Sequence, residues 1–430
     1  KDIDYEFNTQ SDTEVIIAGY KKFGKDFLKK LEGFFSIVIL DIPKNIVIAT
    51  VDPTSVKSLY YELNDKSISI SSELNSFFCK SKIIENLNLK ALQIYLQYGY
   101  VHAPESIMKN VYKLEPGELI EFNLYNFQKT NCKKYNKHYQ SKNNKKFKDL
   151  IIESHKSRLT GDVPIATMLS GGVDSTLSNV IYSNIFKNSE NVYTLGLKDS
   201  AYDESKLALE QTKELKLDHK ILNIHKSEII DEFKILTKYL DEPFADSSSI
   251  LVSLLSKQIS KKYKVVISSD GGDELLFGYS RHRFFFIFFW ICLLPKNLKK
   301  ILKKLCSSKL FSYILEKLNI SHFEIKINKF LSLLEQSNIS TAYMSLIKIM
   351  PDQNTKKIMK EYQGDTIIKN LNSSYGYKSV KEIDYNFYLP SINFKNDRCG
   401  MQHSLEIREP LLNYELVRYK INVDLNDVGQ

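Results

Sequence analysis

Cysteine is scarce in this sequence, and none of its five cysteines lies in a CxxC pair. Their odd number favours a reducing compartment, and so a cytoplasmic protein, over a disulfide framework or a zinc site. Long apolar runs are also missing: 284–294 is eleven residues long, whereas a membrane-spanning helix needs about 20. The 43% hydrophobic and 26% charged residues are those of a globular protein of two or three domains.

Two common phosphate-binding patterns are absent. The sequence contains neither a complete Gly-x-x-x-x-Gly-Lys-Ser/Thr run nor a Gly-x-Gly-x-x-Gly run. The formal charge of +9 comes from lysines spread along the chain, with no recognisable nucleic-acid-binding module among them. We therefore expect no nucleic-acid partner.

A different phosphate loop is present after a strand-like segment, 164–169. It reads Ser170-Gly171-Gly172-Val173-Asp174-Ser175-Thr176 and leads into a helix. Adjacent glycines allow positive φ angles and leave room for an anion against backbone N–H groups, and the helix N-terminus adds positive potential. Asp174 can hold a divalent cation on the phosphates. The loop predicts binding of ATP and Mg²⁺.

A second glycine turn has the same design. Ser268-Ser269-Asp270-Gly271-Gly272-Asp273 follows the short strand 265–267, and from residue 146 onward strand-like and helix-like segments alternate. Such alternation predicts a doubly wound parallel sheet, which binds ligands at the C-terminal ends of its strands. We expect Asp174 and Asp273 to face one cleft and to hold Mg²⁺ together.

The first third of the chain has another pattern. A helix starting at the capping-box sequence 11–14 precedes short β-rich runs separated by turn signals, which predicts an α+β unit with a mostly antiparallel sheet. These runs are 34–40, 46–51, 58–61, 67–71 and 118–122. The polar stretch 130–148 is predicted to be the interdomain linker.

Further motifs follow in a fixed order. They are Asp241-Glu242-Pro243-Phe244-x-Asp246, Asp270-Gly271-Gly272-Asp273-Glu274-Leu275-x-x-Gly278-Tyr279, Lys395-x-Asp397-Arg398 and Ser404-x-Glu406-x-Arg408-x-Pro410. With the first glycine turn, they resemble the glutamine-hydrolysing asparagine synthetases over nearly the whole chain. The resemblance implies an α/β plus α+β fold: a partial N-terminal-nucleophile (αββα) glutaminase domain, 1–135, and an ATP-pyrophosphatase domain with a helical insertion, 136–430.

The family's chemistry assigns roles to these positions. ATP adenylates a carboxylate, PPi leaves, and ammonia attacks the acyl-adenylate to give an amide. The resemblance implies a catalytic set of Lys395, which neutralises phosphate charge, Asp270, which positions or deprotonates the nucleophile, and Arg398. The implied ATP and PPi contacts are Leu169, Ser170, Gly171, Gly172, Asp174, Ser175, Leu195, Ser268 and Ser269. Asp270 replaces a Glu of the family and Ser269 a Gly.

The first third of the chain resembles the later part of a class II glutaminase domain. In that family, the residue matching Asp12 binds the α-amino group of glutamine. The family's nucleophilic Cys precedes this point, and its Arg-Asp-x-x-Gly reads Val51-Asp52-Pro53-Thr54-Ser55 here. From these differences we expect the chain beginning at Lys1 to use ammonium but not glutamine, and its gene to encode an upstream Met-Cys start.

The expected function is that of a ligase that makes asparagine, AMP and PPi from aspartate, ATP and ammonia derived from glutamine. Three alternatives stay open: amidation of a sugar carboxylate in surface-polysaccharide synthesis, a degenerate non-catalytic homologue, and a tRNA-modifying pyrophosphatase. Val51 and Ser55 favour the second, whereas the lack of cysteine pairs opposes the third. A homodimer is also left open.

The apolar run 284–294 stands apart from these motifs, between Arg281-His282-Arg283 and a lysine-rich segment. A buried helix in the insertion is the preferred interpretation. The alternative is a peripheral membrane contact, in which an interfacial helix with a basic flank docks on anionic lipid. Such a contact would suit an acceptor carried on a membrane-linked glycan.

Overall fold

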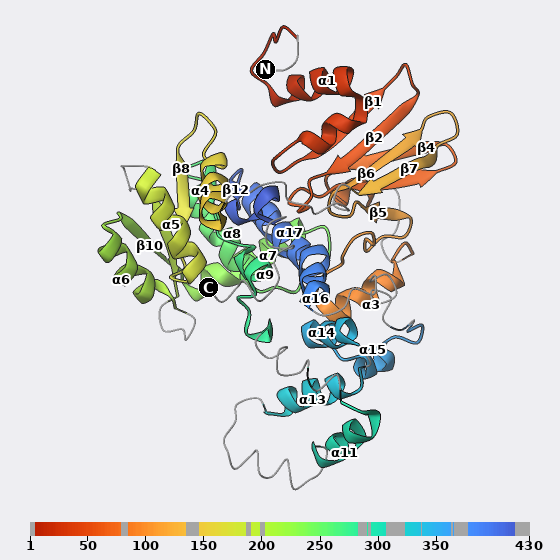
Figure 1. Ribbon diagram of the computed structural model, residues 1–430, viewed down its shortest axis with the longest axis vertical. Helices are drawn as coiled ribbons and strands as arrows, with labels where there is room; N and C mark the ends of the chain where they lie inside the picture. Colours follow the sequence, from red (N-terminus) through yellow and green to blue (C-terminus); the bar gives the residue numbers. More distant parts are fainter. Residues whose placement is uncertain are drawn as a thin grey trace.

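The computed structural model describes residues 5–78, 85–134, 146–185, 191–197, 203–282, 290, 294–306, 323–336, 338–362, 364 and 377–417. An antiparallel α+β unit occupies one end of the long axis, a parallel α/β unit lies beside it, and a group of helices forms the other end (Figure 1). The predicted combination of α+β and α/β architecture is confirmed.

The N-terminal unit starts with α1 (Asp12–Phe23) and the 3₁₀ helix η1 (Gly24–Lys30). Ser11 caps α1 as predicted, since its side chain accepts from the N–H of Thr13 at 3.2 Å. The prediction of the reciprocal hydrogen bond, from the Glu14 side chain to the N–H of Ser11, is wrong. Glu14 does not reach back to Ser11, but accepts from the N–H groups of Asn8 and Thr9 at 2.9 and 2.7 Å.

Two antiparallel sheets follow, as the β-rich runs predict. One has the order β1 (Ser36–Asp41), β2 (Ile46–Val51), β6 (Glu118–Asn123), β7 (Gln128–Lys134), and the other β4 (Ser67–Ser71), β3 (Tyr60–Asn64), β5 (Val111–Lys113). A core cluster that includes Val51, Tyr61, Ile120 and Phe122 joins residues of both sheets. Two helices, α2 (Asn75–Phe78) and α3 (Leu89–Tyr98), lie between β4 and β5 in sequence.

The linker prediction for 130–148 is wrong at both ends. Residues 130–134 belong to β7, because pairing with β6 outweighs the low strand propensity of a polar segment. At the other end α4 (Phe147–Ser157) has already begun. The middle of the predicted linker lies outside the described residues.

The C-terminal unit contains a five-stranded parallel sheet, which confirms the doubly wound prediction. Its order is β10 (His219–Asn223), β9 (Val192–Gly196), β8 (Ile165–Met168), β11 (Val265–Ile267), β12 (Glu406–Arg408). The chain runs outward from β8 to β10 and then returns to place β11 on the other side of β8. This switch point between β8 and β11 is where such sheets bind ligands.

Helices flank this sheet and continue into the insertion. Beside the sheet are α5 (Val173–Ile185), α6 (Ser205–Leu215), α7 (Lys226–Tyr239), α8 (Ser248–Ile259), α9 (Gly272–Leu276) and α17 (Leu389–Met401). A π-helical turn, η4 (Asp384–Tyr388), leads into α17, and the 3₁₀ turn η5 (Pro410–Leu412) follows β12.

The predicted helical insertion consists of α11 (Lys296–Cys306), α13 (Phe323–Leu334), α14 (Ile339–Ile347), α15 (Asp352–Ile358) and α16 (Tyr377–Ile383) in the described part of the chain. Most of 284–294 lies outside the described residues, so both interpretations of that run stay predictions. Within the described ranges, no helix has the length and apolarity needed to cross a bilayer.

Candidate active site

Two glycine turns lie side by side at the C-terminal edge of the parallel sheet. They follow β8 and β11, which pair in parallel from Val265↔Ile165 to Ile267↔Thr167. Gly171 has φ 82° and Gly271 φ 92°, a backbone conformation that side-chain-bearing residues rarely adopt. The sequence prediction that both turns depend on glycine is therefore confirmed.

The turns also touch each other through Asp174. Its carboxylate packs on Gly272, where an added Cβ would lie 2.2 Å from Asp174 Oδ2. Any side chain at 272 would thus displace the carboxylate of the first turn. The contact brings Asp174 to the start of α9, on which Asp273 sits.

Neighbouring side chains hold the first turn in place. Gln211 Nε2 donates to the carbonyl of Gly171 at 2.8 Å, and Thr176 Oγ1 donates to that of Gly172 at 2.8 Å. The hydroxyls of Ser170 and Ser175 lie 3.0 Å apart. These contacts fix the peptide orientations before any ligand binds, which is what a phosphate-binding loop requires. Gln211 was missed by sequence reasoning, because nothing in the 205–215 helix pattern points to this turn.

Three carboxylates accumulate negative charge at this edge. Burial raises the pKa of Asp174, and so does the charge of Asp273 and Asp270. Burial also raises the pKa of Asp273; the His282 and Arg281 side chains act against this, and Asp270 acts in the same direction as burial. No described cation lies within ion-pair distance of Asp174 or Asp273.

Such oxygen donors fit Mg²⁺, which takes one or two protein carboxylates and completes its shell with phosphate and water oxygens. The described residues contain no group of three or more His, Cys, Asp or Glu side chains that could hold a metal ion. The predicted role of Asp174 and Asp273 as Mg²⁺ ligands stays a prediction.

Lys395 brings a buried positive charge to the same region. It lies on α17 with 8% of its surface exposed, and its Nζ is 3.0 Å from Ser248 Oγ and 3.4 Å from Asp246 Oδ2. Burial lowers the pKa of Lys395, but the carboxylates of Asp270 and Asp246 more than offset this and raise it overall. Lys395 is therefore charged at neutral pH and positioned near Asp270.

Asp270 is itself held by two donors. Ser268 Oγ donates to its Oδ2 at 2.5 Å, and Asn396 Nδ2 donates to the same oxygen at 2.8 Å. Asn396 Nδ2 also donates to Glu409 Oε1 at 3.1 Å. Glu409 is fully buried, and burial raises the pKa of its carboxyl to about 8. Sequence reasoning gave Asn396 and Glu409 no role, although both lie inside the quoted C-terminal motifs.

The remaining predicted ATP contacts lie along the same edge. Leu169 is buried at the end of β8, Leu195 is near the end of β9, and Ser268 and Ser269 directly follow β11. Ser269 Oγ donates to Ser178 Oγ on α5 at 2.9 Å. The predicted ATP contacts therefore share one edge with Asp270, Asp273 and Lys395.

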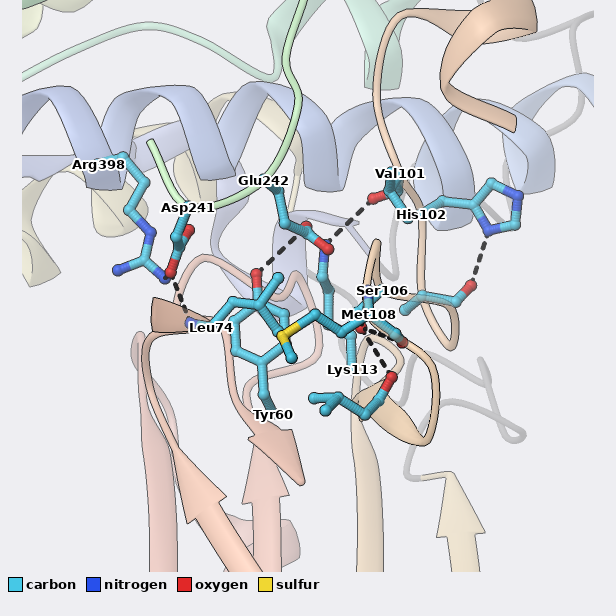
Figure 2. Close-up of polar contacts among 12 residues, drawn as sticks. Tyr60, Leu74, Val101, His102, Ser106, Met108, Lys113, Asp241, Glu242 and Arg398 are labelled. Atoms are coloured by element: carbon cyan, nitrogen blue, oxygen red, sulfur yellow. Dashed lines mark hydrogen bonds and ion pairs between the residues drawn. The ribbon is translucent and has the colours of Figure 1, made fainter. Parts of the chain in front are cut away.

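Two predicted site residues lie elsewhere. Arg398 faces the N-terminal unit, where its Nη2 donates to the carbonyl of Ser72 at 2.7 Å. The same Nη2 is 3.8 Å from Oδ2 of Asp241, which lies beside it (Figure 2). Asp12 is exposed in the first turn of α1, at the end of the molecule opposite the insertion (Figure 1). The proposed glutamine contact of Asp12 stays a prediction.

Arg398 belongs to a buried polar cluster between the two units, which we call the interdomain cluster: Tyr60, Lys113, Asp241, Glu242 and Arg398 (Figure 2). Lys113 forms an ion pair with Glu242, which also accepts from the hydroxyl of Tyr60 at 3.2 Å. Asp241 accepts from the N–H of Leu74 at 2.5 Å. These contacts join β3 and β5 to the segment between α7 and α8.

Comparison with known families gives a match to each unit. Residues 146–427 match the asparagine synthase family, and residues 1–136 match the glutamine amidotransferase domain. The chain belongs to the asparagine synthase family. The resemblance inferred from the motifs is thereby confirmed, and membership accounts for both glycine turns and the C-terminal motifs.

Individual relatives are moderately similar to this family member. Asparagine synthetase 1 of Bacillus subtilis is 26% identical over 95% of this chain and 64% of its own length. A putative asparagine synthetase of Methanocaldococcus jannaschii is 31% identical over 70% of this chain and 60% of its own length. Amidase chry2 of Gibberella zeae is 25% identical over 65% of this chain and 45% of its own length. The chain thus spans less than two thirds of each of these relatives.

Proposed function

We propose that this protein is an ATP-dependent amidotransferase that converts a carboxylate into an amide, with aspartate as the acceptor and asparagine as the product. The observation that carries the proposal is the contact of Asp174 with Gly272. It joins two phosphate-loop-like turns into one anionic edge that lies close to the buried cation Lys395.

In the proposed first step, a carboxylate oxygen of the acceptor attacks the α-phosphorus of ATP, and the bond from that phosphorus to the bridging oxygen of PPi breaks. The N–H groups of 170–175 contact the departing phosphates, and Lys395 stabilises the charge that builds up on them. A bound Mg²⁺, held by Asp174 and Asp273, supplies charge neutralisation for PPi.

In the proposed second step, ammonia attacks the acyl carbon and AMP leaves. The nitrogen loses a proton as the amide forms, and Asp270 is positioned to accept it because Ser268 and Asn396 fix its Oδ2. In the proposed scheme the ammonia comes from glutamine through the N-terminal unit, as its match to the glutamine amidotransferase domain indicates.

A second acceptor class has its own support. Asp270 is one methylene shorter than the Glu expected from the family resemblance, so its carboxylate reaches less far toward an acyl intermediate. A relative bearing the name amidase also shows that proteins similar to this chain are not all named for asparagine. The second candidate is amidation of a larger carboxylate, such as that of a sugar acid.

The deciding experiment measures AMP and PPi released from MgATP in the presence of ammonium, with aspartate and with uronic acids as separate acceptors. Lys395→Met is the matched inactive control, since it keeps the length of the side chain and removes its charge. Acceptor-dependent AMP release matched to amide formation supports the proposal, and the active acceptor decides between the two candidates. If no carboxylate stimulates AMP release by the folded protein, the proposed function is wrong.

A further inference from the structure

Helix α11, outside the candidate active site, has an apolar stripe and a lysine-rich surface. Leu298, Ile301 and Leu305 follow the i, i+3, i+7 spacing of one helix face. The five lysines of α11 lie on the other sides of the helix and are Lys296, Lys299, Lys300, Lys303 and Lys304. The helix contains no acidic residue, so its charge is uniformly positive.

The apolar stripe faces outward. Leu298 is 48% exposed, Ile301 59% and Leu305 58%. A different side of α11 packs on α13, where Cys306 is buried and Lys299 Nζ donates to the carbonyl of Gln336 at 3.1 Å. The helix is therefore anchored to the protein by one side and presents a second, apolar side to its surroundings.

Helix α11 lies at one end of the molecule. The helix lies at the end of the long axis opposite the N-terminal unit, beyond α13 and α14 (Figure 1). A flat surface approaching that end would meet α11 before it met the sheets.

Charge decides which occupant fits. The stripe needs an apolar partner. Lys303 already pairs with Glu335 on the side toward α13, whereas the exposed Lys300 and Lys304 are suited to an anionic partner. A second copy of this chain is disfavoured because apposing two α11 helices would bring ten lysines together on proteins of formal charge +9 each. The headgroup region of an anionic bilayer offers both properties, with acyl chains beneath a layer of phosphates.

We propose that α11 is a membrane-docking helix that lies in the plane of an anionic lipid surface. Leu298, Ile301 and Leu305 enter the boundary between headgroups and acyl chains, and Lys296, Lys300 and Lys304 contact lipid phosphates. The proposal is independent of the acceptor and of the reaction.

The test is cosedimentation of the full chain with phosphatidylcholine vesicles, with and without about 30% phosphatidylglycerol, a fraction that gives a strongly negative surface. We expect binding to the anionic vesicles, little binding to the neutral ones, and weaker binding as salt rises from about 0.1 to 0.5 M. Trp290 supplies a second readout, since it is the only tryptophan of the chain, is 70% exposed and precedes α11 by six residues. Its emission should shift to shorter wavelength when vesicles bind.

Two variants of α11 have matched controls on α7. Ile301→Asp and the double variant Lys300→Glu/Lys304→Glu should each weaken binding about tenfold or more. Ile230→Asp and Lys234→Glu/Lys238→Glu make the same changes on α7, where Ile230 is 56% exposed, and should leave binding unchanged. Circular dichroism and thermal midpoints check that every variant is folded.

Three results would overturn the proposal. They are equal binding to neutral and anionic vesicles, no binding by the folded wild type at low salt, and equal losses in the α7 controls. Size-exclusion chromatography adds a fourth: a wild-type dimer that Ile301→Asp splits would assign the stripe to a second copy of the chain.

Discussion

The carboxylates of the candidate active site differ from those between the two units in one respect. Between the units, Glu242 is paired with Lys113, Asp397 with Lys57 at 2.5 Å, and Asp241 lies 3.8 Å from Arg398. At the sheet edge, Asp174 and Asp273 form no ion pair among the described residues. Burial raises the pKa of each carboxyl, as does the charge of Asp270, and the charge of Asp273 raises the pKa of Asp174 further. Paired carboxylates hold the units together, whereas unpaired ones are suited to an incoming cation.

This difference shows that the role of an acidic motif depends on whether cationic side chains lie next to it in the folded protein. Asp241-Glu242 and Asp273-Glu274 look alike in sequence, but among the described residues only the first pair forms ion pairs with protein cations, which come from distant parts of the chain. The sign of a substitution's effect on stability should therefore separate the two groups.

Removing a cation of the interdomain cluster should have the largest effect. Lys113→Met leaves the charge of Glu242 buried without its partner, which costs about 3–5 kcal/mol of unfolding free energy. Urea unfolding followed by circular dichroism measures the loss. Lys113→Met/Glu242→Gln removes both charges and should recover most of it. An unchanged midpoint in the single variant would show that the pair contributes nothing.

Glu409 is an intermediate case, because it is buried and hydrogen-bonded to Asn396 but forms no ion pair within the described part of the chain. Its pKa rises from 4.5 to about 8 on folding, so the folded chain keeps a proton that the unfolded chain loses between these pH values. Stability should therefore fall as pH rises from 4.5 to 8.

Glu409→Gln removes this pH dependence, since the amide cannot ionise. Above pH 8 the variant should be more stable than the wild type by several kcal/mol, since each unit of pKa shift is worth about 1.4 kcal/mol, and below pH 4.5 the two should be similar. Thermal midpoints across the pH range measure the difference. Parallel curves for the two proteins would contradict the assignment.

Asp174→Asn should change stability in the direction opposite to Lys113→Met. It relieves the repulsion from Asp270 and Asp273, and because Asp174 is only partly buried the expected gain is about 0.5–1 kcal/mol in the absence of nucleotide. Thermal unfolding without ATP or Mg²⁺ measures it. A destabilised variant would mean that Asp174 makes a favourable contact within the protein.

The smallest effect is expected at Ser55. This residue has φ 52° where the family pattern has Gly, so the turn after Asp52 keeps a left-handed residue despite the substitution. Ser55→Gly should relieve that strain and stabilise the protein by about 0.3–0.5 kcal/mol, since added freedom in the unfolded chain offsets part of the gain. A loss of stability would show that the hydroxyl contributes more than the strain costs.

Much of the candidate site could be predicted from the sequence because its determinants are local. Each glycine turn can be recognised by its adjacent glycines and by the buried strand before it. Because the two strands are neighbours in a parallel sheet, the turns that follow them lie side by side. β7 and β12 were not predictable as strands, since β7 is polar and two of the three residues of β12 are charged. The placement of Arg398 could not be predicted from local sequence patterns either, because its partner Ser72 lies 326 residues away in the sequence.

The most direct test of the account is the effect of Mg²⁺ on ATP binding, measured by isothermal titration calorimetry. If Asp174 and Asp273 hold the cation on the phosphates, Mg²⁺ should tighten ATP binding to the wild type by about tenfold or more, and this gain should vanish in Asp174→Asn and Asp273→Asn. Glu73→Gln, which changes a carboxylate near Arg398 at the interface, should retain the gain. An undiminished Mg²⁺ effect in both aspartate variants would contradict the claim that the paired glycine turns form the cation and phosphate site.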